Sequence, residues 1–161
     1  MVEGINNIVK RVEEYKKAVE GNAERLVKWD DEVCSFVKDK LDEIAKQNEI
    51  KELGLYVDEI TKSTRSREIN FRFGTQPYDG NHNKQGGSLV YIPEYNGNIL
   101  IFIRYPQISR KDINITPDPP TESLDTLEPK DITELIVVGH VEKFFTKMIE
   151  WEKKEDNRRG F

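Results

Sequence analysis

The feature that most constrains the fold of this sequence is an apolar heptad repeat within residues 2–48, which contain no proline. With Ile5 at position a, nine of the ten a and d positions up to residue 36 are apolar. The a positions are Ile5, Val12, Val19, Leu26 and Val33, and the d positions are Ile8, Tyr15, Asn22, Trp29 and Phe36. A period of 3.5 residues keeps one stripe of a helix facing a partner helix, so this repeat predicts a helix with a coiled-coil seam.

Gly21 and Asn22 interrupt the repeat, and two structures fit this pair. In the first, a single helix continues through it, at a cost of about 1 kcal/mol for Gly relative to Ala. In the second, Gly21 ends one helix and Asn22 caps the next, which gives a helical hairpin. Val19 and Leu26 keep the heptad spacing across the pair. A hairpin has no need to keep this spacing, so we favour the continuous helix. Beyond residue 36 the stripe shifts by one position, to Val37, Leu41 and Ile44.

The charges beside the seam discriminate weakly between pairing directions, because rim charges contribute only a few tenths of a kcal/mol each. A parallel pair would place Arg11 against Lys16 of the mate, which is unfavourable. An antiparallel pair could bring the basic residues 10–17 toward the acidic residues 30–32. The same stripe could also pack against the chain's own domain, without any oligomer.

Between residues 53 and 105 the apolar period changes to two, which predicts an antiparallel sheet of four strands. The first strand is expected at residues 53–61, followed by a polar turn at residues 62–67. A second strand carries Ile69, Phe71 and Phe73 on one face. Asn96-Gly97 predicts a two-residue type I′ turn between the last two strands.

That turn sets the expected register of the last two strands, which pairs Ile92 with Ile101 and Val90 with Ile103. Both faces of the hairpin are then apolar and both need a cover. We therefore expect three layers, or an interface on one face of the sheet. One expected face carries Val90, Ile92, Ile101 and Ile103, and the other carries Leu89, Tyr91, Leu100 and Phe102.

The remaining segments are two polar connections and a helix. Residues 74–88 are rich in Gly and Asn, as in loops that are mobile or functional. Residues 106–129 hold five of the seven prolines and predict an extended crossing segment, in which Ile113 and Ile115 could add an edge strand. A helix at residues 130–156 is expected to start near Pro129 with the acids Asp131 and Glu134. Alternatively, residues 135–138 form a short buried strand.

Composition excludes several classes of function. A net charge of −5 and a pI of ≈5.2 argue against broad coating of nucleic acid. The longest apolar run, residues 99–103, is far shorter than a membrane span of about 20 residues. A lone cysteine and the lack of a signal peptide at residue 1 favour a cytoplasmic protein. The sequence has neither the phosphate-binding motifs GxxxxGK[ST] and GxGxxG nor the metal-site motifs CxxC and HExxH, so we expect no cofactor and no metal.

The sequence has one cysteine and two histidines, and the neighbours of each predict its role. Cys34 lies near the seam and is expected to be a small buried hydrophobe rather than a nucleophile. His140 lies among apolar residues of the last helix and is expected at its boundary with one hydrogen bond. His82 follows Asp79 by three residues in the loop 74–88, and such a pair can act as a general acid or base.

We therefore expect an α+β protein with a long N-terminal helix or helical hairpin, a four-stranded antiparallel sheet, a proline-rich crossing segment and a C-terminal helix. The N-terminal helical segment spans residues 1–50 and the α+β domain spans residues 51–161, in one compact unit. Within that domain the sheet covers residues 53–105, the crossing segment residues 106–129 and the helix residues 130–156.

The favoured function is that of a small, non-enzymatic interaction or assembly subunit that binds a protein partner, or itself, through the seam. The expected contact row is Val12, Tyr15, Val19, Leu26, Trp29, Val33 and Phe36. A nucleic-acid accessory protein is an alternative, with cations on the turn and sheet at Lys62, Arg65, Arg67, Arg72 and Arg104. An enzyme with a site in the loop 74–88 is a further alternative.

Overall fold

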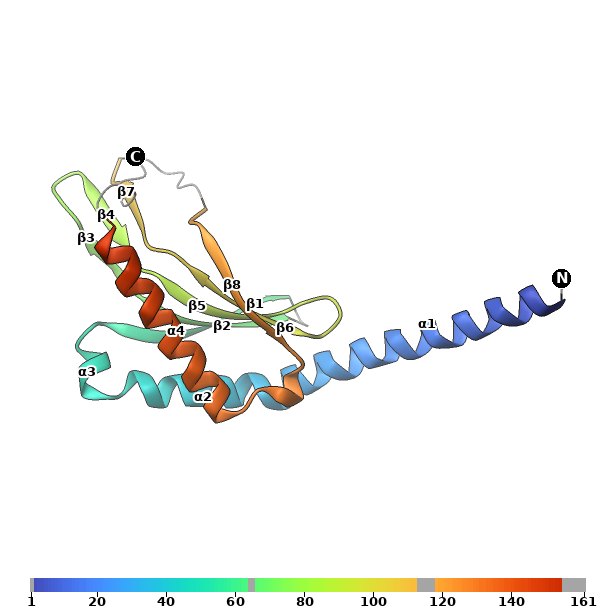
Figure 1. The fold of residues 1–161 in the computed structure, drawn as a ribbon. Coiled ribbons are helices and arrows are strands. Elements are labelled where there is room, and N and C mark those ends of the chain that lie inside the picture. The colour runs from blue at the N-terminus through green and yellow to red at the C-terminus, as the bar shows by residue number, and fades with distance from the viewer. Residues whose placement is uncertain (1, 64–65, 113–117, 155–161) are drawn as a thin grey trace.

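The computed structural model describes residues 2–63, 66–112 and 118–154 (Figure 1). Helix α1 (Val2–Lys28), a π-helical turn (Trp29–Val33) and α2 (Cys34–Ala45) form one continuous helical rod, and a short helix α3 (Asn48–Lys51) follows. The prediction of a continuous helix through Gly21 and Asn22 is confirmed, and the alternative of a helical hairpin there is wrong. The first part of the rod, in α1, extends away from the other elements. We call the part of the described structure from Trp29 onward the body.

The π-helical turn explains why the apolar stripe shifts along the rod. The backbone N–H of Cys34 donates to the carbonyl of Trp29, five residues earlier, instead of the usual four. This wider turn rotates the following residues relative to the heptad frame, so that Val33, Val37 and Leu41 are buried in succession. Phe36, the last d position of the heptad frame, is only half-buried.

The main sheet has five antiparallel strands, one more than the sequence predicted. Their order across the sheet is β1 (Leu55–Ser63), β2 (Ser66–Phe73), β5 (Ser88–Pro93), β6 (Ile99–Arg104) and β8 (Thr121–Leu127). The fifth strand, β8, lies in the expected crossing segment and pairs with β6. Ile113 and Ile115, for which an edge strand was considered, lie outside the described residues.

A second, smaller sheet contains β3 (Thr75–Pro77), β4 (His82–Gln85) and β7 (Gln107–Arg110). The expectation of a loop at residues 74–88 is therefore wrong, because most of this segment forms an antiparallel hairpin that pairs with β7. Glycine permits the close packing at the base of this hairpin: a Cβ added at Gly86 would lie 2.1 Å from Cβ of Phe73.

The predicted register of the β5–β6 hairpin is wrong by one residue. Tyr91 pairs with Ile101 and Leu89 with Ile103. The connection is a longer turn, in which the N–H of Gly97 donates to the carbonyl of Glu94 (2.9 Å) and only Gly97 has a positive φ, of 83°. A shift of one residue exchanges the faces of a strand relative to its neighbour, so Leu89, Tyr91, Ile101 and Ile103 share one face and are fully buried.

Both long helices of the body cover that one face, so the expected third layer is absent from the described structure. Helix α4 (Glu134–Lys153) follows a 3-10 turn (Pro129–Asp131), and residues 135–138 are helical rather than a strand. Thr133 caps α4 by accepting a hydrogen bond from the N–H of Ile136 (3.3 Å), in place of the expected Asp131. The rings of Phe71 and Phe144 meet edge to face beneath α4, with centroids 6.0 Å apart.

On the opposite face of the sheet, polar side chains cover the middle of β5. Arg104 reaches from β6 across β5 to β2, where it contacts Glu68 (3.3 Å) and Asn70 (3.4 Å). Val90 lies on β5 between these strands and is fully buried. The aliphatic part of a long cation can cover apolar surface in this way. No helix in the described ranges is long and apolar enough to cross a membrane.

Candidate functional site

The structure divides the predicted contact row between two surroundings. Val12, Tyr15 and Val19 are exposed on the extended part of α1, and Leu26 is half-buried at its base. Trp29 and Val33 belong to the core of the body, and Phe36 packs partly against that core. Only the first three residues of the row are therefore available to a partner without unfolding the body.

We call residues 2–20 of α1 the arm, because every one of them is exposed. Its heptad a and d positions place a continuous apolar stripe along one side of the helix. The exposed large apolar side chains of the arm are Val2, Ile5, Ile8, Val9, Val12, Tyr15 and Val19. A stripe of this length is unusual on a free surface, since large exposed apolar patches mark interaction sites.

The base of the arm is held by the turn between β5 and β6. The guanidinium of Arg25 donates through Nε to the carbonyl of Asn96 (2.9 Å) and through Nη2 to Oδ1 of Asn22 (2.6 Å). Gly97 lies so close to α1 that an added Cβ would be 2.7 Å from the carbonyl oxygen of Asn22. These contacts fix where the arm leaves the body.

A second network holds the π-helical turn against the sheet. The indole N–H of Trp29 donates to the carbonyl of Arg67 (2.9 Å), whose guanidinium donates to the carbonyl of Asp30 (2.6 Å). The same guanidinium forms an ion pair with Glu59 (2.5 Å). Cys34 is buried beside this network, as predicted, and burial raises the pKa of its thiol to about 12. A thiol with such a pKa is a poor nucleophile.

The candidate nucleic-acid cations do not share one surface. Arg67 lies on the helix-covered side of the sheet, bound to Asp30 and Glu59. Arg72 and Arg104 lie on the opposite side, where Arg72 contacts Asp58 (3.7 Å) and Arg104 contacts Glu68 (3.3 Å). The side chain of Lys62 and the whole of Arg65 lie outside the described structure. The described cations are therefore divided between two faces and neutralised by acids.

The candidate catalytic pair lies at the tip of the β3–β4 hairpin. The carboxylate of Asp79 accepts hydrogen bonds from the N–H of Asn81 (2.8 Å) and from Nδ1 of His82 (2.8 Å). The backbone N–H of Asn81, and then His82, hold the pKa of Asp79 below its usual value. Asp79 thus stabilises the turn of the hairpin, and this structural role accounts for its contact with His82.

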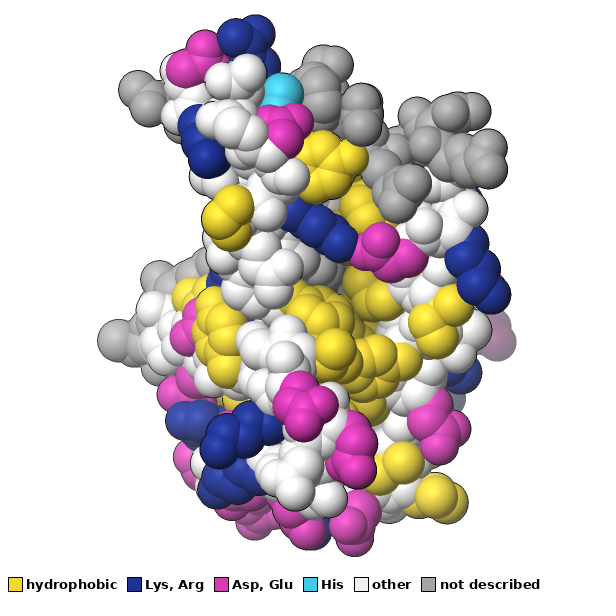
Figure 2. All heavy atoms as spheres, turned by 90° about the vertical axis from the view of Figure 1, so that its left-hand side faces the viewer, with side chains coloured by type: hydrophobic (Ala, Val, Ile, Leu, Met, Phe, Trp, Pro, Cys, Tyr) yellow, Lys and Arg dark blue, Asp and Glu magenta, His cyan; other side chains and the backbone are white. Residues whose placement is uncertain are grey.

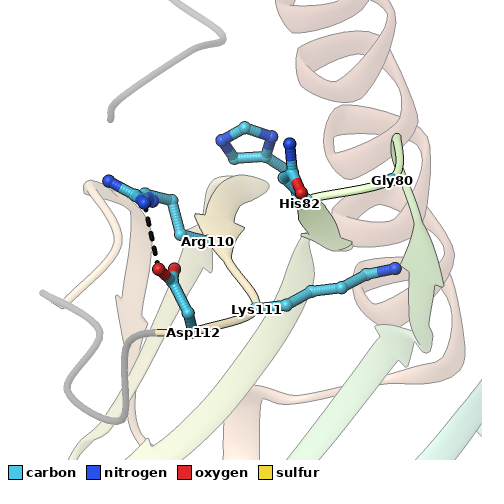
Figure 3. Close-up of a pocket in the computed structure, with 6 residues that line it drawn as sticks. Gly80, His82, Arg110, Lys111 and Asp112 are labelled. Atoms are coloured by element: carbon cyan, nitrogen blue, oxygen red, sulfur yellow. Dashed lines mark hydrogen bonds and ion pairs between the residues drawn. The ribbon is translucent and has the colours of Figure 1, made fainter.

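A hollow of about 450 Å³ lies beside this pair (Figure 3). His82 faces it from β4, and Arg110 and Asp112, which are joined by an ion pair of 3.0 Å, face it from β7 and the segment after it. Its lining is Gly80, Asn81, His82, Arg110, Lys111 and Asp112. None of these lining side chains carries a hydroxyl or a thiol for the imidazole to deprotonate.

A larger apolar cavity, of about 550 Å³, lies beside the C-terminal half of α4 and was not predicted from the sequence. Figure 2 shows the face on which hydrophobic side chains gather in this hollow. Lys84 and Glu152 form an ion pair at its rim, and the ammonium group of Lys84 lies 5.2 Å from the ring of Trp151. Its apolar lining includes Leu53, Phe73, Pro106, Phe145, Met148 and Ile149. The cavity can enclose an apolar group, but its lining contains no histidine, cysteine or hydroxyl.

The sequence also gave no sign of a buried polar chain beneath α4. The hydroxyl of Tyr91 lies 2.7 Å from Nδ1 of His140, and Nε2 of His140 lies 3.2 Å from Asp125. An ionised carboxylate only accepts, so Nε2 carries the proton and Nδ1 accepts from the tyrosine hydroxyl. Burial lowers the pKa of His140, and Asp125 offsets part of this effect. His140 is therefore buried with two partners, rather than at a boundary with one.

Comparison of the chain with protein-family models, with curated proteins and with solved structures found no match. Within the described ranges, no group of three or more histidine, cysteine or acidic residues is arranged to hold a metal ion. Of the surfaces described, the arm is the one on which exposed apolar side chains repeat with a regular spacing.

Proposed function

We propose that this protein is an assembly subunit that associates with a second copy of itself through the arm. The observation that carries the proposal is the exposure of all five a and d residues of the arm. These residues are Ile5, Ile8, Val12, Tyr15 and Val19. The same heptad frame is buried against the sheet at Trp29 and Val33, so the pattern is one that this chain uses for packing.

The arm also needs support to remain helical. Isolated helices shorter than about 12–15 residues are marginal in water, and longer ones draw most of their stability from packing of an apolar face. Gly4, Asn6 and Asn7 are weak helix formers near its start. A partner helix against the apolar stripe would supply the missing packing.

The energetics favour reversible pairing. Full burial of a large apolar side chain contributes about 1.5–3 kcal/mol, so burial of the exposed half contributes about 1 kcal/mol. Two arms offer ten such side chains, against an association cost on the order of 4–15 kcal/mol. The two quantities are comparable, and we therefore expect a dimer that dissociates on dilution.

The charge of the arm supports a second copy as the partner. Residues 2–20 hold four basic and four acidic side chains, so two arms approach without net repulsion although the whole chain carries −5. The basic residues are Lys10, Arg11, Lys16 and Lys17, and the acidic residues are Glu3, Glu13, Glu14 and Glu20.

The test is the solution mass of the chain by light scattering over a range of concentrations. The wild type is expected to rise from 18.8 kDa toward twice that value as concentration increases. A Val12→Gln/Tyr15→Gln variant is expected to stay monomeric, because two apolar layers of the stripe are lost. Gln is a good helix former and leaves the charge unchanged.

The matched control is a Glu13→Gln/Lys17→Gln variant, which also introduces two glutamines and keeps the net charge, but on the solvent side of the arm. It is expected to dimerise like the wild type. A wild-type chain that remains monomeric at every concentration would overturn the proposal, and so would a Val12→Gln/Tyr15→Gln variant that keeps the wild-type mass.

A further inference from the structure

The body lies on the same side of α1 as the apolar stripe of the arm. At the base of the arm, Asn22 and Leu26 are half-buried, whereas Ala23 and Val27 are exposed. Asn22 and Leu26 are d and a positions of the heptad frame that the arm uses. The β5–β6 turn sits on this side, because a Cβ at Gly97 would lie 2.7 Å from the carbonyl of Asn22 and 3.1 Å from the N–H nitrogen of Leu26.

This position of the body conflicts with parallel pairing of two arms. In a parallel pair the a and d sides face each other along the whole length, with helix axes about 8–10 Å apart. Both bodies would then begin at the same level, between the two helices. Each body contributes at least the turn at residues 94–98 and the strands behind it, which that gap cannot hold twice.

We infer that the two arms pair antiparallel, in a register that places Val12 against the partner's Tyr15 and Ile8 against the partner's Val19. This inference rests on the proposed self-association. In this register Ile5 reaches the level of the partner's Asn22, where the partner body begins. Each arm therefore fills the stripe of the other up to the point at which the β5–β6 turn contacts α1.

The charges beside the stripe agree with this direction. A parallel pair sets Arg11 against the partner's Lys16, which are like charges. The antiparallel register instead sets Arg11 beside the partner's Ala18, and Val9 beside the aliphatic stem of the partner's Lys16. Like charges in contact are thereby avoided, and the lysine stem covers apolar surface.

Disulfide trapping tests the direction and the register. A disulfide needs Cα atoms about 4.4–6.8 Å apart. In the inferred register, residue 8 of one arm lies opposite residue 19 of the other, whereas two copies of residue 8 are about 16 Å apart along the axis, at 1.5 Å per residue. An Ile8→Cys variant alone and a Val19→Cys variant alone are therefore expected to form no covalent dimer, and an equimolar mixture of the two is expected to form one. Intact mass identifies the mixed species.

The wild type is the matched control, because its single cysteine, Cys34, is buried with a pKa of about 12 and should not cross-link. Light scattering on the same samples distinguishes a failure of self-association from a failure of the inferred direction or register. Samples that stay monomeric at every concentration overturn the proposed function. Samples that dimerise and trap both Ile8→Cys with itself and Val19→Cys with itself overturn the antiparallel direction, because no single antiparallel register brings both pairs together. Dimers in which only one variant traps with itself, or in which no combination traps, overturn the register.

Discussion

Tyr15 and Trp29 occupy the same heptad position on one helical rod, yet the first is 70% exposed and the second is fully buried. The sequence around both is amphipathic, and both segments are helical. The difference is that the sheet lies beneath Trp29 and ends before it reaches Tyr15. An amphipathic period therefore predicts a helix with an apolar side, whereas the layer that covers this side depends on how far the rest of the fold extends.

Replacement of these two aromatic residues should have the largest and most unequal effects. Trp29→Ala is expected to reduce the free energy of unfolding by about 3–5 kcal/mol, through a large cavity and loss of the hydrogen bond to the carbonyl of Arg67. Tyr15→Ala is expected to change it by no more than about 0.5 kcal/mol in dilute solution. Urea denaturation of both variants at a concentration where the chain is monomeric provides the measurement. Equal losses would mean that the arm is packed against the body.

The helical part of the structure could be predicted because its signal is local. Residues 2–45 contain no proline and keep one amphipathic stripe through Gly21 and Asn22. The one-residue shift of that stripe after residue 36 was visible in the sequence, and the π-helical turn is its physical form. The burial of the stripe at residues 29–37 could not be predicted, because no property of these residues alone distinguishes a contact with the core from a contact with a partner.

The sheet could be predicted only in outline, because its register depends on packing rather than on local pattern. Strands β5 and β6 are apolar on both faces, so two registers that differ by one residue look equivalent in the sequence. The helices select the register that places Leu89, Tyr91 and Ile101 beneath them. Strand β8 carries few apolar residues and follows a proline-rich stretch, which hid its pairing with β6.

The buried polar chain and the cavity could not have been predicted, because their members come from separate parts of the sequence. Tyr91, Asp125 and His140 lie on β5, β8 and α4 and meet only when the sheet is assembled under α4. The exposed arm, in contrast, was part of the predicted contact row, since its three members Val12, Tyr15 and Val19 are read from one repeat.

Two glycines with positive φ test how firmly the β5–β6 turn holds the base of the arm, because only one of them contacts α1. Gly97 (φ 83°) lies against α1, and Gly54 (φ 76°) has open space around its Cβ position. Gly54→Ala is expected to cost about 1–2 kcal/mol for the left-handed conformation alone. Gly97→Ala adds overpacking of about 1–3 kcal/mol against Asn22 and Arg25. Thermal or urea unfolding of the two variants measures the difference, and identical losses would show that the turn does not hold the base of the arm.

The smallest effect should come from pH, and it should affect the body and not the arm. Burial holds the pKa of His140 below the ordinary value of 6.5, so the unfolded chain takes up a proton before the folded chain does. Stability is therefore complete above pH 6.5 and falls as pH decreases through 6.5 toward the pKa of the folded state. Protonation of Nδ1 also removes the acceptor of the Tyr91 hydroxyl.

The arm, residues 2–20, contains no histidine, the side chain whose charge ordinarily changes in this range, so arm pairing should be insensitive to the same change. Unfolding free energies measured between pH 7.5 and 5.5 are expected to decrease for the wild type and to stay nearly level for His140→Gln, with a wild-type loss smaller than either loss predicted for Trp29→Ala or Gly97→Ala. Dimer dissociation measured over the same range should not change. A wild-type slope that persists in His140→Gln would assign the titration to another group, and a pH-dependent dimer would mean that the arm contacts titratable residues of the body when it pairs.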